Sequence, residues 1–141
     1  MSAIEPNVAA LLWFALLWTT TCLGFLILCG MYPMHTRPQA ARASGALALI
    51  VLNSVLWLAL AAGTLAFGYG ELRLTTLIVV GGLVMLFAPA PFEAMPAIWR
   101  DGRRGLAALL VVQAAGLAVW LAVSQAGAQF VGAQLAGAPL V

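Results

Sequence analysis

The chain has 141 residues, of which 65% are hydrophobic and only 7% are charged, and its mean hydropathy is +1.08. Soluble domains carry roughly 25% charged residues, so this composition excludes a soluble enzyme, a disordered chain and a secreted disulfide scaffold. The net charge of +2 is too small and too dispersed for a nucleic-acid-binding surface, which needs several basic groups on one face. The sequence therefore predicts a small polytopic membrane protein, a class that does not by itself define a function.

Four windows without Arg, Asp or Glu are long enough to cross a bilayer, which takes about 20 apolar residues. We expect spans at about 8–31, 45–68, 74–92 and 106–130. Helices satisfy their own backbone hydrogen bonds in lipid, so each span should be helical. Residues 1–7 have no basic side chain, which argues against a cleaved signal peptide. The predicted fold is an all-α integral membrane protein, a single domain over 1–141 with four transmembrane helices in two hairpins that form an antiparallel bundle.

The arginines predict the orientation of these spans. Five of the six arginines lie in the two loops at about 32–44 and 93–105, and only Arg73 lies elsewhere. Positive residues in short loops stay on the cytoplasmic side of the membrane. We therefore expect a multi-pass protein of the cell inner membrane with both loops in the cytoplasm and both termini on the periplasmic or outer side.

The first span and its following loop contain the cysteines and the only histidine. Cys22 and Cys29 are seven residues apart, so their α-carbons would stand about 10 Å apart, too far for a disulfide within one helix. We expect them to pack as small hydrophobic side chains. His35 lies in the loop. Because it is the only histidine, a haem held by two histidines of this chain and a multi-histidine metal site are excluded.

The second span contains Asn53, and the fourth span contains Gln113 in its first half. Counted from Gly45 and Leu106, Asn53 and Gln113 lie at a similar depth of roughly 11 to 12 Å. An amide pair at one depth can form a hydrogen bond across the bundle, so we expect structural pairing between them. The alternative is that one amide contacts a partner chain or a ligand headgroup such as a quinone.

The loop at 93–105 combines an aromatic residue with several charges. Trp99 lies among helically spaced apolar residues, and we expect it to be an anchor at the lipid headgroups together with Arg100, Arg103 and Arg104. Glu93 and Asp101 share this side of the membrane with His35. If the three converged, they could form an acid/base set at the interface, although each is more simply the partner of a headgroup or an arginine.

Small residues follow one face of the fourth span. Ala114, Ala118 and Ala122 recur every four residues and predict a smooth stripe for helix packing or for contact with a partner. Alanine-rich helices also produce this spacing by chance. A faint similarity between 45–66 and 105–126, at an offset of 60, is largely explained by the same Ala- and Leu-rich composition.

The spans contain no ionisable side chain of the kind that marks a proton or ion pathway. We therefore expect a non-catalytic accessory or scaffolding subunit of a larger inner-membrane complex, such as a respiratory or photosynthetic one. Its expected partners are other integral membrane subunits and lipid, not nucleic acid. We expect no intrinsic cofactor and no metal, whereas a lipid or quinone could bind at an interface.

Two other functions are compatible with the sequence. The first is a small homo-oligomeric transporter or pore, which would need a continuous polar stripe built from Thr20, Asn53, Thr76 and Gln113. The second is an interfacial lipid-modifying enzyme, which would need His35, Glu93 and Asp101 to converge below a lipid-sized cleft.

Overall fold

The computed structural model describes residues 7–32, 45–100 and 103–137, with side chains to residue 125. This part of the chain is helical and contains no strand. Its elements are α1 (Val8–Cys29), α2 (Ala46–Glu71), α3 (Leu74–Phe87), α4 (Pro89–Ala94), α5 (Ala97–Arg100) and α6 (Arg103–Gly137).

Four segments of the described chain are long and apolar enough to cross a membrane. They are Val8–Cys29, Ala46–Glu71, Leu74–Ala94 and Arg103–Gln125. The prediction of an all-helical, multi-pass membrane protein is thereby confirmed at this level.

Local sequence signals explain where the first two helices begin. The Asn7 side chain accepts a hydrogen bond from the Ala10 N–H at 3.1 Å and so caps the first turn of α1. Gly45 precedes α2 with φ +83°, a left-handed conformation that glycine adopts without steric cost. The connection from α2 to α3 is only Leu72 and Arg73, which are extended.

The third apolar segment is interrupted near its lower end. α3 ends at Phe87, Ala88 follows, and α4 begins at Pro89. Proline is well tolerated in the first turn of a helix, because its missing N–H would have no partner there. The expected span at 74–92 is therefore two helices in series, with α4 extending to Ala94.

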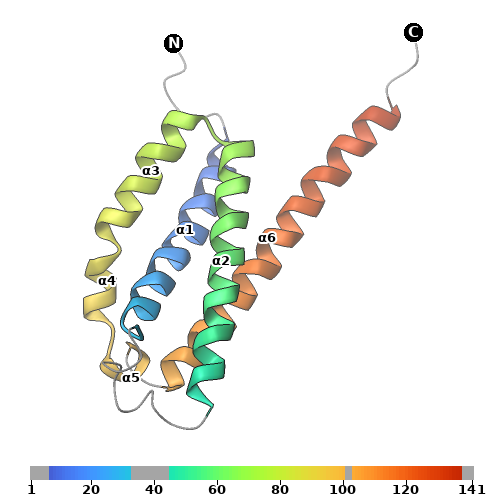
Figure 1. Ribbon diagram of the computed structural model, residues 1–141. Helices are drawn as coiled ribbons and strands as arrows, with labels where there is room; N and C mark the ends of the chain where they lie inside the picture. Colours follow the sequence, from blue (N-terminus) through green and yellow to red (C-terminus); the bar gives the residue numbers. More distant parts are fainter. Residues whose placement is uncertain (1–6, 33–44, 101–102, 138–141) are drawn as a thin grey trace.

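The long helices form a row in the order α3, α1, α2, α6 (Figure 1). α1 packs against both α2 and α3, and α6 packs mainly against α2 and less extensively against α1. α2 and α3 follow each other in the chain, yet they contact each other less than either contacts α1. The upper half of α6 diverges from α2 in Figure 1, so the molecule is broader at that end.

Two apolar clusters hold the helices together, one near each end of the long helices. At the end where α2 and α3 connect, Phe14 of α1 is fully buried with Leu72, and Leu77 packs beside them. Asn7 Nδ2 also donates to Glu71 Oε2 there, at 3.2 Å. At the opposite end, a second cluster joins α1, α2 and α6 through Ile27, Leu28, Met31, Ile50, Leu106 and Leu109.

The last helix differs most from its expected span. α6 begins at Arg103, three residues before the expected start at 106, and continues to Gly137. Its 35 residues extend over about 50 Å at 1.5 Å per residue, whereas the hydrocarbon core of a bilayer is about 30 Å thick. α6 is therefore longer than a helix needs to be to cross the membrane.

Candidate functional site

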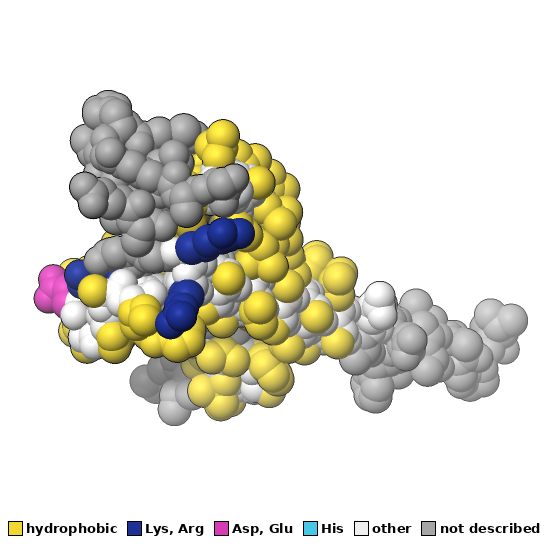
Figure 2. Space-filling model, turned by 90° about the horizontal axis from the view of Figure 1, so that it is seen from below, with side chains coloured by type: hydrophobic (Ala, Val, Ile, Leu, Met, Phe, Trp, Pro, Cys, Tyr) yellow, Lys and Arg dark blue, Asp and Glu magenta, His cyan; other side chains and the backbone are white. Residues whose placement is uncertain are grey.

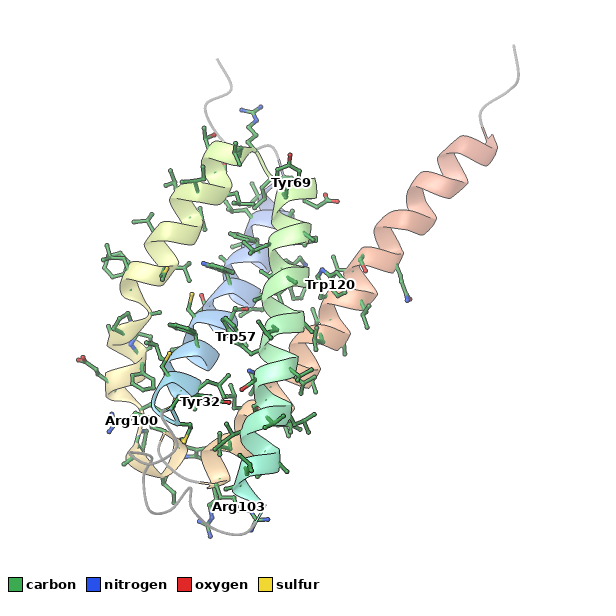
Figure 3. The ribbon with its side chains drawn as sticks, viewed as in Figure 1. Tyr32, Trp57, Tyr69, Arg100, Arg103 and Trp120 are labelled. Carbon is green, nitrogen blue, oxygen red and sulfur yellow. The ribbon has the colours of Figure 1, made fainter. Side chains whose placement is uncertain are left out.

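The predicted interfacial anchors lie together at one end of the molecule. Figure 3 shows Arg100 and Arg103 at the end opposite Tyr69, and Figure 2 shows basic side chains spread over this face beside apolar surface. Trp99 is half exposed on the short helix α5, and the Arg100 guanidinium lies 5.6 Å from the centre of the Phe92 ring. Arg103 and Arg104 are exposed in the first turn of α6.

Both amide side chains of the spans are fully buried between helices, but in different environments. Asn53 Nδ2 donates to the carbonyl oxygens of Leu49, at 2.8 Å, and Leu106, at 3.1 Å, and so links α2 to α6. Gln113 has no hydrogen-bond partner for either amide atom among the described residues. The expected hydrogen bond between the two amides is not formed.

The register of α6 against α2 accounts for this difference, because Gly116 lies against Leu60 and Trp120 against Gly63, which places Asn53 level with the turn before Gln113. Asn53 is seven residues beyond the first residue of α2, whereas Gln113 is ten residues beyond Arg103, which places it about 4.5 Å further along its helix. Gln113 therefore lies against α1 at Gly24 instead of facing Asn53. A Cβ on Gly24 would lie 3.1 Å from Gln113 Nε2, so the missing side chain makes room for the amide.

The polar residues of the spans do not form a continuous stripe on the described surface. Thr20 and its neighbours Thr19 and Thr21 donate their hydroxyls to carbonyl oxygens one turn earlier in α1, at 2.7 to 3.0 Å. Asn53 and Gln113 are closed off from the surface of the chain. Within the described residues, no polar path therefore leads along the long helices from one of their ends to the other.

The remaining titratable candidates do not form a described cluster. Glu93 is exposed on α4, while His35 and Asp101 lie outside the described residues. No group of three His, Cys, Asp or Glu side chains that could hold a metal occurs in the described part of the chain. Of the two cysteines, Cys22 is buried and Cys29 is exposed, and both are free thiols.

Glycines let α2 and α6 approach each other closely. A Cβ on Gly63 of α2 would lie 3.1 Å from the Trp120 ring of α6, and a Cβ on Gly116 would lie 3.3 Å from Leu60. These close approaches let α2 and α6 come together. Figure 3 shows Trp120 between the two helices.

The alanine stripe lies on a different face of α6. Ala114, Ala118 and Ala122 are all exposed, whereas Gly116 and Trp120 face α2 and α1. Among the described residues, the stripe therefore makes no packing surface. It remains available as a smooth, small-residue surface on the helix at the end of the row.

Two tryptophans have a role that was missed in the sequence. Trp18 Nε1 donates to the Gly81 carbonyl oxygen at 3.0 Å and joins α1 to α3, and Trp57 Nε1 donates to the Thr21 carbonyl oxygen at 2.9 Å and joins α2 to α1. A buried indole N–H needs a partner, so a tryptophan in the middle of a span is a signal for such a bond. The sequence does not reveal which carbonyl accepts it.

Two grooves open on the sides of the row. The first has a volume of about 340 Å³ and lies between α1, α5 and α6, near the arginines. The second has a volume of about 660 Å³ and lies between α1 and α2, where the Tyr32 and Ser54 hydroxyl oxygens are 3.3 Å apart.

Comparison of the chain with protein-family models, curated proteins and solved structures finds no match.

Proposed function

We propose that the protein is a non-catalytic accessory subunit that presents α6 to another integral membrane protein of a larger assembly. The observation that carries this proposal is the exposure of Ala114, Ala118 and Ala122 on the helix at the end of the row. The surface that α6 uses within the chain lies elsewhere, at Gly116 and Trp120.

The physical argument rests on what drives helix association in lipid. Apolar side chains gain little by leaving lipid for protein, so helices associate where small residues let their backbones approach closely. A stripe of alanines in contact with acyl chains contributes little to the stability of this chain, whereas against a second helix it allows close packing. The extra length of α6 and its divergence from α2 provide more of this helix for such a contact.

We propose an orientation in which the arginine end faces the cytoplasm and both termini lie on the outer side of the inner membrane, with the helices as two hairpins. One end of the long helices carries Arg100, Arg103 and Arg104. The opposite end, where α2 connects to α3, carries Arg73. The bias of basic residues toward the cytoplasm supports this orientation.

Purification from the native membrane in mild detergent tests the proposal. We expect the tagged chain to elute in a particle that contains larger integral membrane subunits. Ala118→Trp should reduce the yield of these subunits at least several-fold, because a bulky side chain on the stripe separates the two helices. Insertion of the chain itself should be unchanged.

Ala62→Trp is the matched control, since Ala62 is exposed on α2, away from the stripe. It should leave the particle intact. A particle that contains only this chain, or equal loss of partners in both variants, would overturn the proposal.

A further inference from the structure

The groove between α1, α5 and α6 is apolar along its walls. Its lining consists of Thr20, Leu23, Ile27, Met95, Trp99, Gly105, Ala108, Leu109 and Val112. The one hydroxyl among these residues, that of Thr20, already donates to the Leu16 carbonyl oxygen at 3.0 Å. An occupant therefore needs no polar group inside the groove.

The dimensions of the groove suit a chain-like occupant. On α1 it extends from Thr20 to Ile27 and on α6 from Gly105 to Val112, about 10 Å along each helix at 1.5 Å per residue. A volume of about 340 Å³ is at the lower limit of small-molecule sites and is elongated along the helices. One acyl chain matches this shape better than a folded polar ligand.

A positive charge lies on the same face of α6 as the groove. Arg104, Ala108 and Val112 are spaced four residues apart, so they share one face of the helix, and the last two line the groove. Arg104 is exposed in the first turn of α6, where the helix dipole adds further positive potential. This end of the groove therefore favours an anion.

The mouth of the groove has the features of a membrane interface. Trp99 lines it and is half exposed, and the Trp99 carbonyl oxygen occupies the space that a Cβ on Gly105 would need, so α5 lies directly against the start of α6. Arg100 follows Trp99 in the chain. An amphipathic ring beside basic side chains is the arrangement found at lipid headgroups.

We propose that this groove is a binding site for an anionic phospholipid, with one acyl chain along α1 and α6 and the phosphate at Arg104. The charge at the mouth determines the headgroup, and the apolar walls hold the chain. The proposal concerns the chain alone and does not depend on a partner subunit.

The test uses the full chain in phosphatidylcholine vesicles that contain either brominated phosphatidylglycerol or brominated phosphatidylcholine. Bromine quenches nearby tryptophan, and the difference between the unsubstituted protein and Trp99→Phe isolates the signal at the groove mouth. We expect the brominated phosphatidylglycerol to half-quench this signal at about fivefold lower mole fraction, the preference that one interfacial arginine provides.

Two matched variants separate a site from general charge. Arg104→Gln should remove the preference. Arg103→Gln should retain it, because the Arg103 Nη2 atom lies 3.6 Å from where a Cβ on Gly45 would be, toward the start of α2. Equal quenching by both lipids in the unsubstituted protein, or equal loss in both arginine variants, would overturn the proposal.

A third variant tests the groove itself. Ala108→Phe should fill the groove and reduce quenching of the Trp99 signal by the brominated chains, and Val112→Phe provides a second filling substitution if the first does not fold. Quenching that persists unchanged in a folded filling variant would also overturn the proposal.

Discussion

Asn53 and Gln113 show how two buried amides in one membrane domain can have opposite energetic effects. Asn53 Nδ2 donates one hydrogen bond within α2 and one to α6, and its Oδ1 has no partner among the described residues. Gln113 is equally buried, but both of its amide atoms have no partner among the described residues. A buried polar group without a hydrogen bond costs free energy, and the cost is larger when no water can replace the bond.

Replacement of each amide by an apolar side chain should therefore change stability in opposite directions. Asn53→Leu should lower the free energy of unfolding by about 1 kcal/mol, because one hydrogen bond to α6 and one bond within α2 are lost. Gln113→Met should leave it unchanged or raise it by about 1 to 3 kcal/mol, because an unsatisfied amide is removed at similar volume. Unfolding of both variants in detergent, followed by circular dichroism, measures the difference.

A large loss of stability in Gln113→Met would contradict this expectation. It would mean that Gln113 has a partner in the membrane, such as a water molecule or a ligand. The substitution of Asn53 is the internal control, since its partners are visible in the structure.

At the scale of the elements, glycines allow the closest approaches between neighbouring helices. Gly24, Gly63 and Gly116 each lie within 3.4 Å, measured from an added Cβ, of a side chain on a neighbouring helix. Ala114, Ala118 and Ala122 of α6 are exposed within the described part of the chain. Contacts between α2 and α6 therefore depend on a few positions where no side chain fits.

Gly63→Leu should separate α2 from α6. Its Cβ alone would lie 3.1 Å from the Trp120 ring, and the remaining side chain would have to displace that ring, which should cost about 1 to 3 kcal/mol. Gly82→Leu is the control, because a Cβ on Gly82 of α3 meets nothing within 4 Å. The control should leave stability unchanged or raise it by less than about 1 kcal/mol, since leucine favours helix over glycine.

Thermal unfolding in detergent compares the two glycine variants, and the difference in fluorescence between each variant and the same variant with Trp120→Phe isolates the Trp120 signal. Equal destabilisation by both substitutions would contradict a specific contact between Gly63 and Trp120.

The sequence predicted the number and approximate positions of the four segments able to cross a membrane, because a bilayer requires about 20 apolar residues for each span. It did not predict the interruption at Ala88, since Pro89 and Pro91 are equally compatible with the end of a helix. The start of α6 at Arg103 was also missed, because charged residues can form the first turn outside the lipid. This one-turn error produced the expectation that Asn53 and Gln113 would meet.

The order of the helices was less predictable than their positions. Periodicity of apolar residues identifies a buried face only when the opposite face is polar, and these helices are apolar all round. The contacts that define the row include a glycine against Trp120 and indole N–H groups bonded to carbonyl oxygens. Neither kind of contact leaves a pattern in the sequence of the partner helix.

At the scale of the whole molecule, the arginines make the two ends of the long helices chemically different. Arg100, Arg103 and Arg104 lie at one end, while the other contains Asn7, Glu71 and Arg73. The proposed topology predicts that alkaline phosphatase fused after Val141 is active, since this reporter folds only outside the cytoplasm. Fusion within the loop before α6 should be inactive.

The opposite pattern of phosphatase activity would show that the orientation is the reverse of the proposed one. Replacement of Arg100, Arg103 and Arg104 together by glutamine provides a second test, because it removes three of the five arginines in the loops expected to be cytoplasmic. We expect this triple variant to show mixed orientation, with phosphatase activity reduced at Val141.

The row also determines how the molecule meets its surroundings. α3 and α6 form its two ends, and each has extensive apolar surface that no other helix of the chain covers. On α3, lipid acyl chains are sufficient to cover this apolar surface. We propose that a second helix covers the small side chains of α6, and the start of the same helix forms one wall of the groove proposed to bind lipid.

The bonds from Trp18 and Trp57 to backbone carbonyl oxygens have an evolutionary consequence. A backbone carbonyl oxygen can accept a hydrogen bond regardless of which side chain its own residue carries. At Gly81, an added Cβ would lie 3.7 Å from the Trp18 indole nitrogen, which is an ordinary contact. Selection on these bonds therefore constrains the tryptophans and leaves the accepting positions free to drift. Homologues could retain the same joints between α1, α2 and α3 without any pair of co-varying residues to reveal them.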